Sequence, residues 1–98
     1  MFEHIQPLHT KVEKVISLNT GSIVLESPSG FPLKESNLYY ASQEGEVLWY
    51  AEKPAPDTLF NRVRLNDDGE TLSAYTTGRH ACELELKTGK LISQLGFK

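Results

Sequence analysis

Short runs rich in β-branched and aromatic residues alternate along the chain with polar turns. A turn of the form polar-polar-Gly-polar occurs four times, and each copy precedes such a run. The glycines of these turns are Gly21, Gly45, Gly69 and Gly89. Glycine in a polar turn between two β-rich runs favours a hairpin in which the glycine adopts a positive φ. The pattern therefore predicts four hairpins, with a positive φ at each of these glycines.

The same pattern predicts eight β-strands joined mostly by short turns. The expected strands are 12–18, 22–26, 37–42, 46–52, 59–65, 70–76, 80–86 and 90–95. Prolines keep the two longer connections, 27–36 and 53–58, out of central strands. Because strands that follow one another usually pair, we predict an all-β antiparallel meander. Its arrangement is expected to be a sandwich, a partly closed barrel or two blade-like sheets.

The length of the chain, 98 residues, predicts a single all-β domain over 1–98. The first ten residues do not follow the strand pattern. Phe2, Ile5 and Leu8 fit one turn of helix, but Pro7 interrupts it. A short N-terminal arm or helix that packs on the sheet is therefore expected before the first strand.

The segments 38–41 and 47–51 are apolar on both faces, unlike the other predicted strands. Such a hairpin must be covered on two sides, by a second layer, an arm or another subunit. We predict that the protein self-associates through this hairpin, most simply as a homodimer. In the alternative, the chain is a monomer whose N-terminal arm covers the hairpin through Phe2 and Ile5.

Two segments resemble a known repeat. Residues 37–49, NLYYASQEGEVLW, resemble one repeat of the quinoprotein-type (PQQ-like) β-propellers, and residues 81–92, ACELELKTGKLI, resemble a weaker copy. The second copy has Ser93 where the repeat has tryptophan, and Ser42 replaces the aspartate expected before the first turn. Eight strands would make only two blades, and a closed propeller needs at least four. The resemblance therefore implies hairpin geometry only, and nothing about quinone binding is inferred from it.

Charge and apolar content limit the partners and the compartment. The net charge is −3 and the pI is about 5.5, which argues against nucleic acid because phosphate binding needs a concentrated basic surface. The longest apolar run, 47–51, is far shorter than a membrane span. The N-terminus lacks the pattern of a signal peptide. We therefore expect a cytoplasmic protein without a membrane or nucleic-acid partner.

His80 and Cys82 are the strongest candidates for a metal site. On a strand they share one face, and histidine with cysteine suits zinc. His4 or His9 from the N-terminal arm would have to complete the site. The alternative is that Cys82 packs in the core and His80 lies at its rim. Because no metal-ligand spacing is present, we expect no metal, no cofactor and no catalytic residue.

Aromatic and arginine side chains on neighbouring predicted strands have the composition of a protein-binding surface. The candidate surface residues are Tyr39, Leu48, Tyr50, Phe60, Arg62, Arg64 and Tyr75. The sequence therefore favours a small non-catalytic interaction module that uses an exposed sheet face or edge. One alternative is a small metal-assisted enzyme around His80 and Cys82. Another is an inhibitor of a partner protein, of the kind that confers immunity to a toxin.

Overall fold

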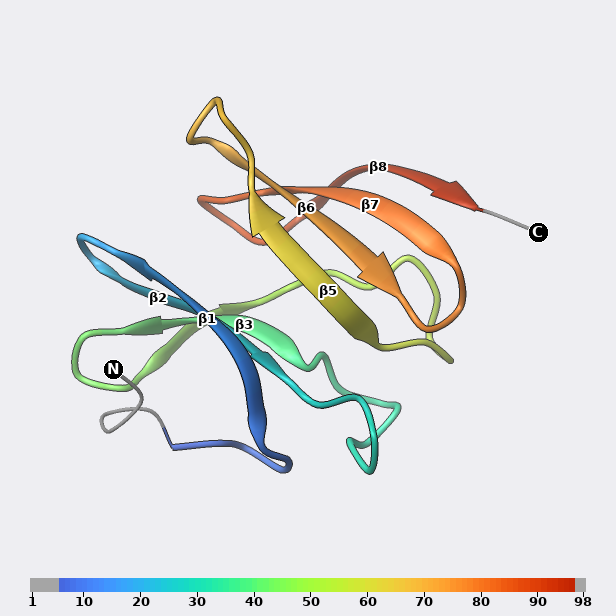
Figure 1. Ribbon diagram of the computed structural model, residues 1–98, viewed down its shortest axis with the longest axis horizontal. Coiled ribbons are helices and arrows are strands. Elements are labelled where there is room, and N and C mark those ends of the chain that lie inside the picture. Colours follow the sequence, from blue (N-terminus) through green and yellow to red (C-terminus); the bar gives the residue numbers. More distant parts are fainter. Residues whose placement is uncertain (1–5, 97–98) are drawn as a thin grey trace.

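The computed structural model describes residues 6–96, which form eight β-strands and no helix. The strands are β1 (Val12–Leu18), β2 (Gly21–Glu26), β3 (Leu38–Ser42), β4 (Val47–Tyr50), β5 (Phe60–Leu65), β6 (Thr71–Thr76), β7 (His80–Glu85) and β8 (Leu91–Gly96). All strand neighbours are antiparallel, in two four-stranded sheets ordered β1-β2-β3-β4 and β5-β6-β7-β8 (Figure 1). The predicted antiparallel meander is confirmed, each strand end lies within two residues of its predicted position, and the sheets do not close into a barrel.

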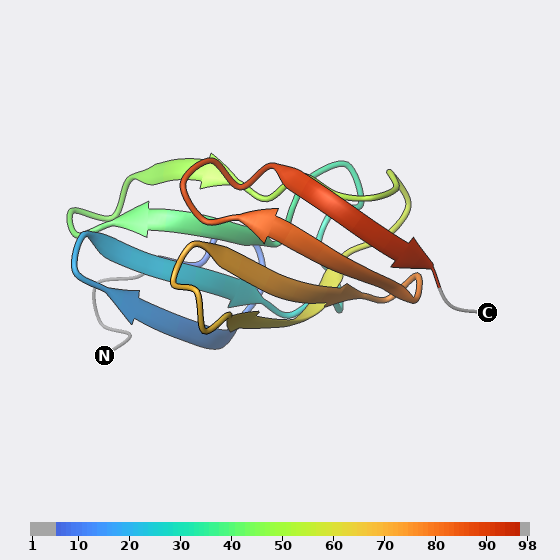
Figure 2. The same ribbon diagram turned by 90° about the horizontal axis from the view of Figure 1, so that it is seen from above.

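The two sheets lie face to face, and both run in the same order across the molecule (Figure 2). Apolar side chains that point inward from both sheets fill the space between them. The fully buried members of this core are Ile23, Leu25, Leu38, Ala51, Phe60, Val63, Leu72, Ala74, Cys82 and Leu84. Burial of one large aliphatic or aromatic side chain contributes about 1.5–3 kcal/mol. This shared core therefore holds the two sheets together.

Asn37, just before β3, joins the two sheets through its side chain. Its amide nitrogen donates to the carbonyl oxygens of Glu26, at 2.7 Å, and Phe60, at 2.6 Å. Its amide oxygen accepts the backbone N–H of Phe60 at 2.8 Å. Asn37 is fully buried, so these bonds satisfy backbone groups that water cannot reach. The side chain thereby positions the start of β5 against the first sheet.

Trp49 joins the sheets at the opposite edge. Its indole N–H donates to the carbonyl oxygen of Leu86 at 3.0 Å, and its ring packs edge to face on Tyr40. The segment after β4 continues this contact, because the backbone N–H of Glu52 donates to the carbonyl of Gly89 at 2.8 Å. The end of β4 is thus attached to the turn between β7 and β8.

Residues 6–10 form an irregular arm that packs on the outer face of the first sheet. Leu8 contacts the buried side chains of Val24, Tyr39 and Ala41, and Val12 and Val47 complete this second cluster. The predicted cover by an N-terminal arm is therefore present at Leu8. Phe2 and Ile5, to which that prediction assigned the contact, lie outside the described residues.

Three of the four predicted positive φ values are confirmed, at Gly45, Gly69 and Gly89. The prediction for Gly21 was wrong, because its φ is not positive. Gly21 is the first residue of β2, and a Cβ there would overlap the carbonyl oxygen of Ala41. Glycine is needed at this position for the close approach of β3 rather than for the turn.

Candidate interaction surface

Two of the predicted surface residues are buried. Tyr39 is 1% exposed and Phe60 is fully buried. Tyr39 lies under the N-terminal arm with its hydroxyl on Glu26, and Phe60 points into the core between the sheets. The elements that cover them come from distant parts of the chain, so the local alternation does not show which side chains lie beneath them. We therefore remove both residues from the candidate surface.

The remaining candidates fall on two separate sheets. Leu48 and Tyr50 lie on β4, at the edge of the first sheet, and are 55% and 52% exposed. Arg62 and Arg64 lie on β5 and Tyr75 on β6, both in the second sheet, and all three are exposed. The structure thus divides the predicted surface into a small β4 patch and a larger area on the second sheet.

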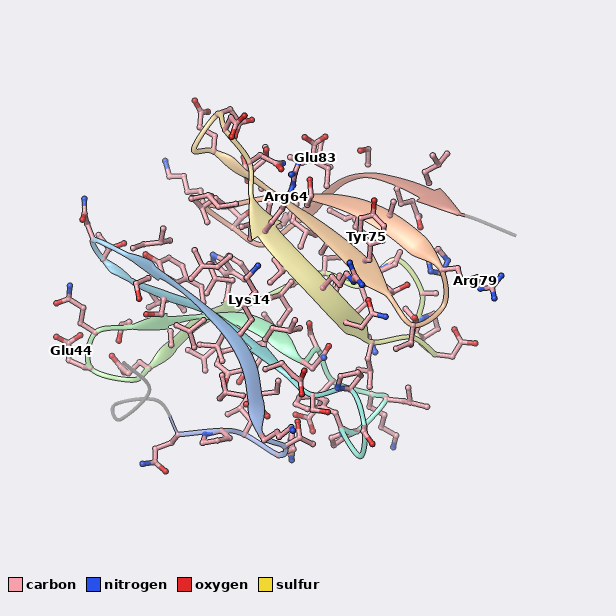
Figure 3. The ribbon with its side chains drawn as sticks, viewed as in Figure 1. Lys14, Glu44, Arg64, Tyr75, Arg79 and Glu83 are labelled. Atoms are coloured by element: carbon pink, nitrogen blue, oxygen red, sulfur yellow. The ribbon has the colours of Figure 1, made fainter. Side chains whose placement is uncertain are left out.

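The larger area is the outer face of the second sheet, which we call the sheet-2 face. Cross-strand partners define it in two rows. The first row is Arg62, Tyr75, Ala81 and Leu95, and the second is Arg64, Ser73, Glu83 and Ser93. These residues alternate with the core residues of the same strands. Figure 3 shows Arg64, Tyr75 and Glu83 on this sheet.

The outer face of the first sheet is covered by another segment of the chain, and the sheet-2 face is not covered by any described segment. The arm of residues 6–10 packs on the first sheet, whereas no segment within residues 6–96 packs over the sheet-2 face. Tyr75 and Leu95 are 50% and 63% exposed there. A face that combines exposed apolar, aromatic and arginine side chains is typical of a protein-binding surface.

The two arginines of this face are free to accept a ligand. Within the described part of the chain, the guanidinium groups of Arg62 and Arg64 form no hydrogen bond and no ion pair. Glu83 and Glu85 are the acidic residues on this face of β7. Glu83, the nearer one, lies two strands away from Arg64, a separation of about 10 Å between the strands. Both guanidinium groups therefore keep their donors available.

A groove of about 1150 Å³ extends over the sheet-2 face and around β5 toward β1. Lys14, Leu25 and Val63 line it where β1 approaches β5, and the rows of the sheet-2 face line the rest. The ammonium group of Lys14 donates to the carbonyl oxygen of Val63 at 2.8 Å. Val63 lies between Arg62 and Arg64 on β5, and Figure 3 labels Lys14 and Arg64. Glu13 and Glu83 are the acidic residues of the groove's lining.

His80 and Cys82 have different surroundings on β7. Cys82 is buried in the core, and burial raises the pKa of its thiol to about 11. His80 Nδ1 lies 3.0 Å from the hydroxyl of Thr76, and His9 bonds Glu35 on the far side of the first sheet. Within residues 6–96, no three His, Cys, Asp or Glu side chains group so that they could hold a metal ion. His4 lies outside the described residues.

The hairpin expected to mediate self-association is largely covered within the chain. Leu38, Tyr39, Ala41 and Ala51 are buried, on one face by the core and on the other by the arm. Only the β4 patch remains accessible. Self-association through this hairpin would therefore have a small contact area.

Several members of the sheet-2 face were not among the predicted residues. Ser73, Ala81, Glu83, Ser93 and Leu95 are individually ordinary surface residues. The signal that identifies Ser73, Ala81 and Glu83 is the alternation of strands 70–76 and 80–86, which places them opposite the core residues, and Ser93 and Leu95 follow as the cross-strand partners of Glu83 and Ala81. Alternation could define the face, but only the three-dimensional structure shows that this face lacks the cover that the arm gives to the other sheet.

Comparison of the chain with protein-family models, with curated proteins and with solved structures gave no match. Within the described residues, no helix has the length and apolar character needed to cross a membrane.

Proposed function

We propose that the protein is a small non-catalytic interaction module whose sheet-2 face binds an acidic, extended segment of a partner protein. The observation that supports this proposal is the pair of unpaired arginines, Arg62 and Arg64, beside the exposed ring of Tyr75. Arginine and tyrosine are the residue types that contribute most to binding at protein interfaces.

The spacing of the arginines suggests the geometry of the partner. Arg62 and Arg64 are two residues apart on one strand and point to the same side, so their Cα atoms are about 7 Å apart. Carboxylates at alternate positions of an extended chain have the same spacing. Each guanidinium can hold one carboxylate through two parallel hydrogen bonds. Tyr75 lies directly across from Arg62. Its ring can contact the side chain or backbone that lies between the two carboxylates of the partner segment.

A titration with a defined peptide tests the proposal. The probe is a capped octapeptide in which glutamate alternates with valine, and the control peptide has lysine in place of glutamate. We expect the acidic peptide to shift the backbone amide resonances of Arg62, Arg64 and Tyr75, and its binding to weaken as salt rises. The lysine peptide should leave these resonances unchanged.

Two variants make the test specific. Arg62→Ser combined with Arg64→Ser should weaken binding of the acidic peptide by about tenfold or more, which corresponds to about 1.4 kcal/mol. The control is Arg79→Asn, which removes an exposed arginine from the turn between β6 and β7, where asparagine tolerates the positive φ of 66°. Equal loss in both variants would contradict the proposal. So would tighter binding of a single-stranded oligonucleotide of the same length, which would indicate a phosphate site instead.

A further inference from the structure

Each sheet has two edge strands, and three of the four edges are protected against pairing with another chain. β1 exposes the charged side chains of Glu13 and Lys14 at a β-bulge, and Lys14 is bonded across to β5. β5 exposes Arg62 and Arg64 beside a bulge of its own. Charges and bulges are the usual means by which proteins prevent edge-to-edge association.

β4 is protected by its length and by the segment that follows it. The strand has only four residues. Directly after it, the backbone N–H of Glu52 donates to the carbonyl of Gly89, and the carboxylate of Glu52 accepts the backbone N–H of Leu91 at 2.8 Å. The chain thus leaves the edge of the first sheet and bonds to the second, so an incoming strand finds only a short row of free backbone groups.

β8 has these protections only at its start, where Glu52 accepts the backbone N–H of Leu91 and a bulge lies between Leu91 and Ser93. It runs for six residues, Leu91–Gly96, which include no charged residue and no proline. Among the described strands it pairs only with β7. Ile92 and Leu95 are 53% and 63% exposed, so the edge is also apolar. After the bulge, Ser93–Gly96 form an uncharged edge whose outward backbone groups no described strand pairs, and such an edge favours pairing with another strand.

We propose that β8 pairs with β8 of a second copy of the chain, antiparallel and across a two-fold axis perpendicular to the sheet. This symmetry brings residues of the same face together: with Gln94 opposite Gln94 of the second copy, Ser93 of each copy lies opposite Leu95 of the other. No charged side chain of β8 meets a like charge, since the strand has none. β8 can therefore pair with β8 of a second copy without bringing like charges together.

The paired dimer joins two copies of the second sheet into one sheet of eight strands. The two sheet-2 faces then become one continuous surface, with Arg62 and Arg64 of both copies on the same side. A single strand pairing is small beside the interface of about 1,600 Å² that a typical specific complex buries. The dimer is accordingly expected to dissociate in the micromolar range. The pairing itself does not depend on the proposed binding of an acidic segment.

The mass of the protein in solution tests this dimer. Light scattering after size exclusion should approach twice the chain mass of 11.0 kDa as the concentration rises to several hundred micromolar. Leu95→Lys and Ile92→Lys should each reduce the mass to that of the monomer. The matched control is Leu48→Lys, which places a charge at the equally exposed edge of β4 and should leave the dimer intact.

Hydrogen exchange on the unmodified protein gives a second measurement that does not depend on any variant. The amides of β8 that point away from β7 should exchange more slowly at high than at low protein concentration. A monomer at several hundred micromolar, or exchange of β8 independent of concentration, would overturn the proposal. Loss of the dimer in Leu48→Lys alone would assign the contact to the β4 patch instead. Ile92→Lys, which changes no residue of the two rows of the sheet-2 face and none that lines the groove, should still bind the glutamate–valine octapeptide, so the dimer and the proposed function can fail separately.

Discussion

The hydroxyl of Tyr39 donates a hydrogen bond of 2.5 Å to the carboxylate of Glu26, and both side chains are buried beneath the N-terminal arm. The same carboxylate accepts the backbone N–H groups of Leu8 at 2.6 Å, His9 at 3.0 Å and Thr10 at 2.9 Å. A single fully buried charge thus holds three successive amides of the arm on the first sheet. The arm, in turn, covers the apolar outer face of that sheet.

The ionisation of Glu26 should control the stability of this contact. Burial acts to raise the pKa of Glu26, but the hydrogen bonds from Thr10, Tyr39, Leu8 and His9 outweigh it, and the pKa is below its usual value. A carboxylate with a lowered folded pKa stabilises the fold above its unfolded pKa, and this contribution is lost as the pH falls through the folded pKa. Glu26→Gln should therefore reduce the free energy of unfolding by about 2–3 kcal/mol at neutral pH, because buried N–H donors lose their charged acceptor.

Urea denaturation between pH 3 and pH 7 measures this effect. The difference between the unmodified protein and Glu26→Gln should shrink as the pH falls below about 4, the ordinary range of a carboxyl pKa. Glu44→Gln, at the exposed turn between β3 and β4 (Figure 3), is the control and should change stability by less than about 0.5 kcal/mol. A difference that stays constant over the whole pH range would show that Glu26 does not act through its charge.

Removal of the Asn37 side chain should weaken the contact between the two sheets and lower the free energy of unfolding. Asn37→Ala leaves the backbone N–H and C=O of Phe60 without their partner in a buried site. Each buried group left without a bond costs about 1–3 kcal/mol, so we expect a loss of about 3 kcal/mol in urea denaturation. Asn61→Ala, an exposed asparagine on β5, should have little effect. Equal stability of the two variants would contradict the bridging role of Asn37.

Local patterns were sufficient to predict the strands, because alternation and turn glycines act over a few residues. The predicted hairpins at Gly45, Gly69 and Gly89 follow from such local rules. The candidate surface was only partly predictable. Arg62, Arg64 and Tyr75 occupy outward positions of their strands, which alternation indicates, whereas the burial of Tyr39 and Phe60 depends on segments distant in sequence.

Glu26 was not predicted to have any role, and the reason is physical. A glutamate at the end of a strand is ordinarily exposed, and its burial requires donors from an arm that precedes it by 16 to 18 residues. Asn37 is similar, since its partners on β5 lie 23 residues away. The sequence contains no periodic signal for such long-range polar contacts. They become visible only once the sheets are assembled.

Burial of Cys82 should make its thiol unreactive in the folded protein. The raised pKa, about 11, means that the folded state keeps the thiol proton at pH values where an unfolded cysteine, with a pKa of about 8.5, has lost it. The contribution of the protonated Cys82 thiol to the free energy of unfolding is therefore fully present below about pH 8.5 and is lost as the pH rises toward 11. At pH 8, alkylation by iodoacetamide should be at least about a hundredfold slower than in urea. Rapid alkylation of the folded protein would contradict the buried position.

Gly89 and Gly69 provide a matched pair for the role of turn glycines. Both have a positive φ, 75° and 68°, so alanine is strained at either position by about 1 kcal/mol. They differ in their surroundings. A Cβ at Gly69 meets nothing within 4 Å, whereas a Cβ at Gly89 would overlap the ring of Trp49.

Gly89→Ala should therefore cost about 3 kcal/mol or more, and Gly69→Ala only about 1 kcal/mol, in urea denaturation. The additional loss arises because Trp49 must move, and its indole then gives up its hydrogen bond to Leu86 and its contact with the core. Trp49 is the only tryptophan of the chain, so its fluorescence reports this movement directly. The emission maximum should shift to longer wavelength in Gly89→Ala and remain unchanged in Gly69→Ala, because only the first variant exposes the indole to water. Equal destabilisation with identical spectra would mean that backbone strain alone explains both glycines.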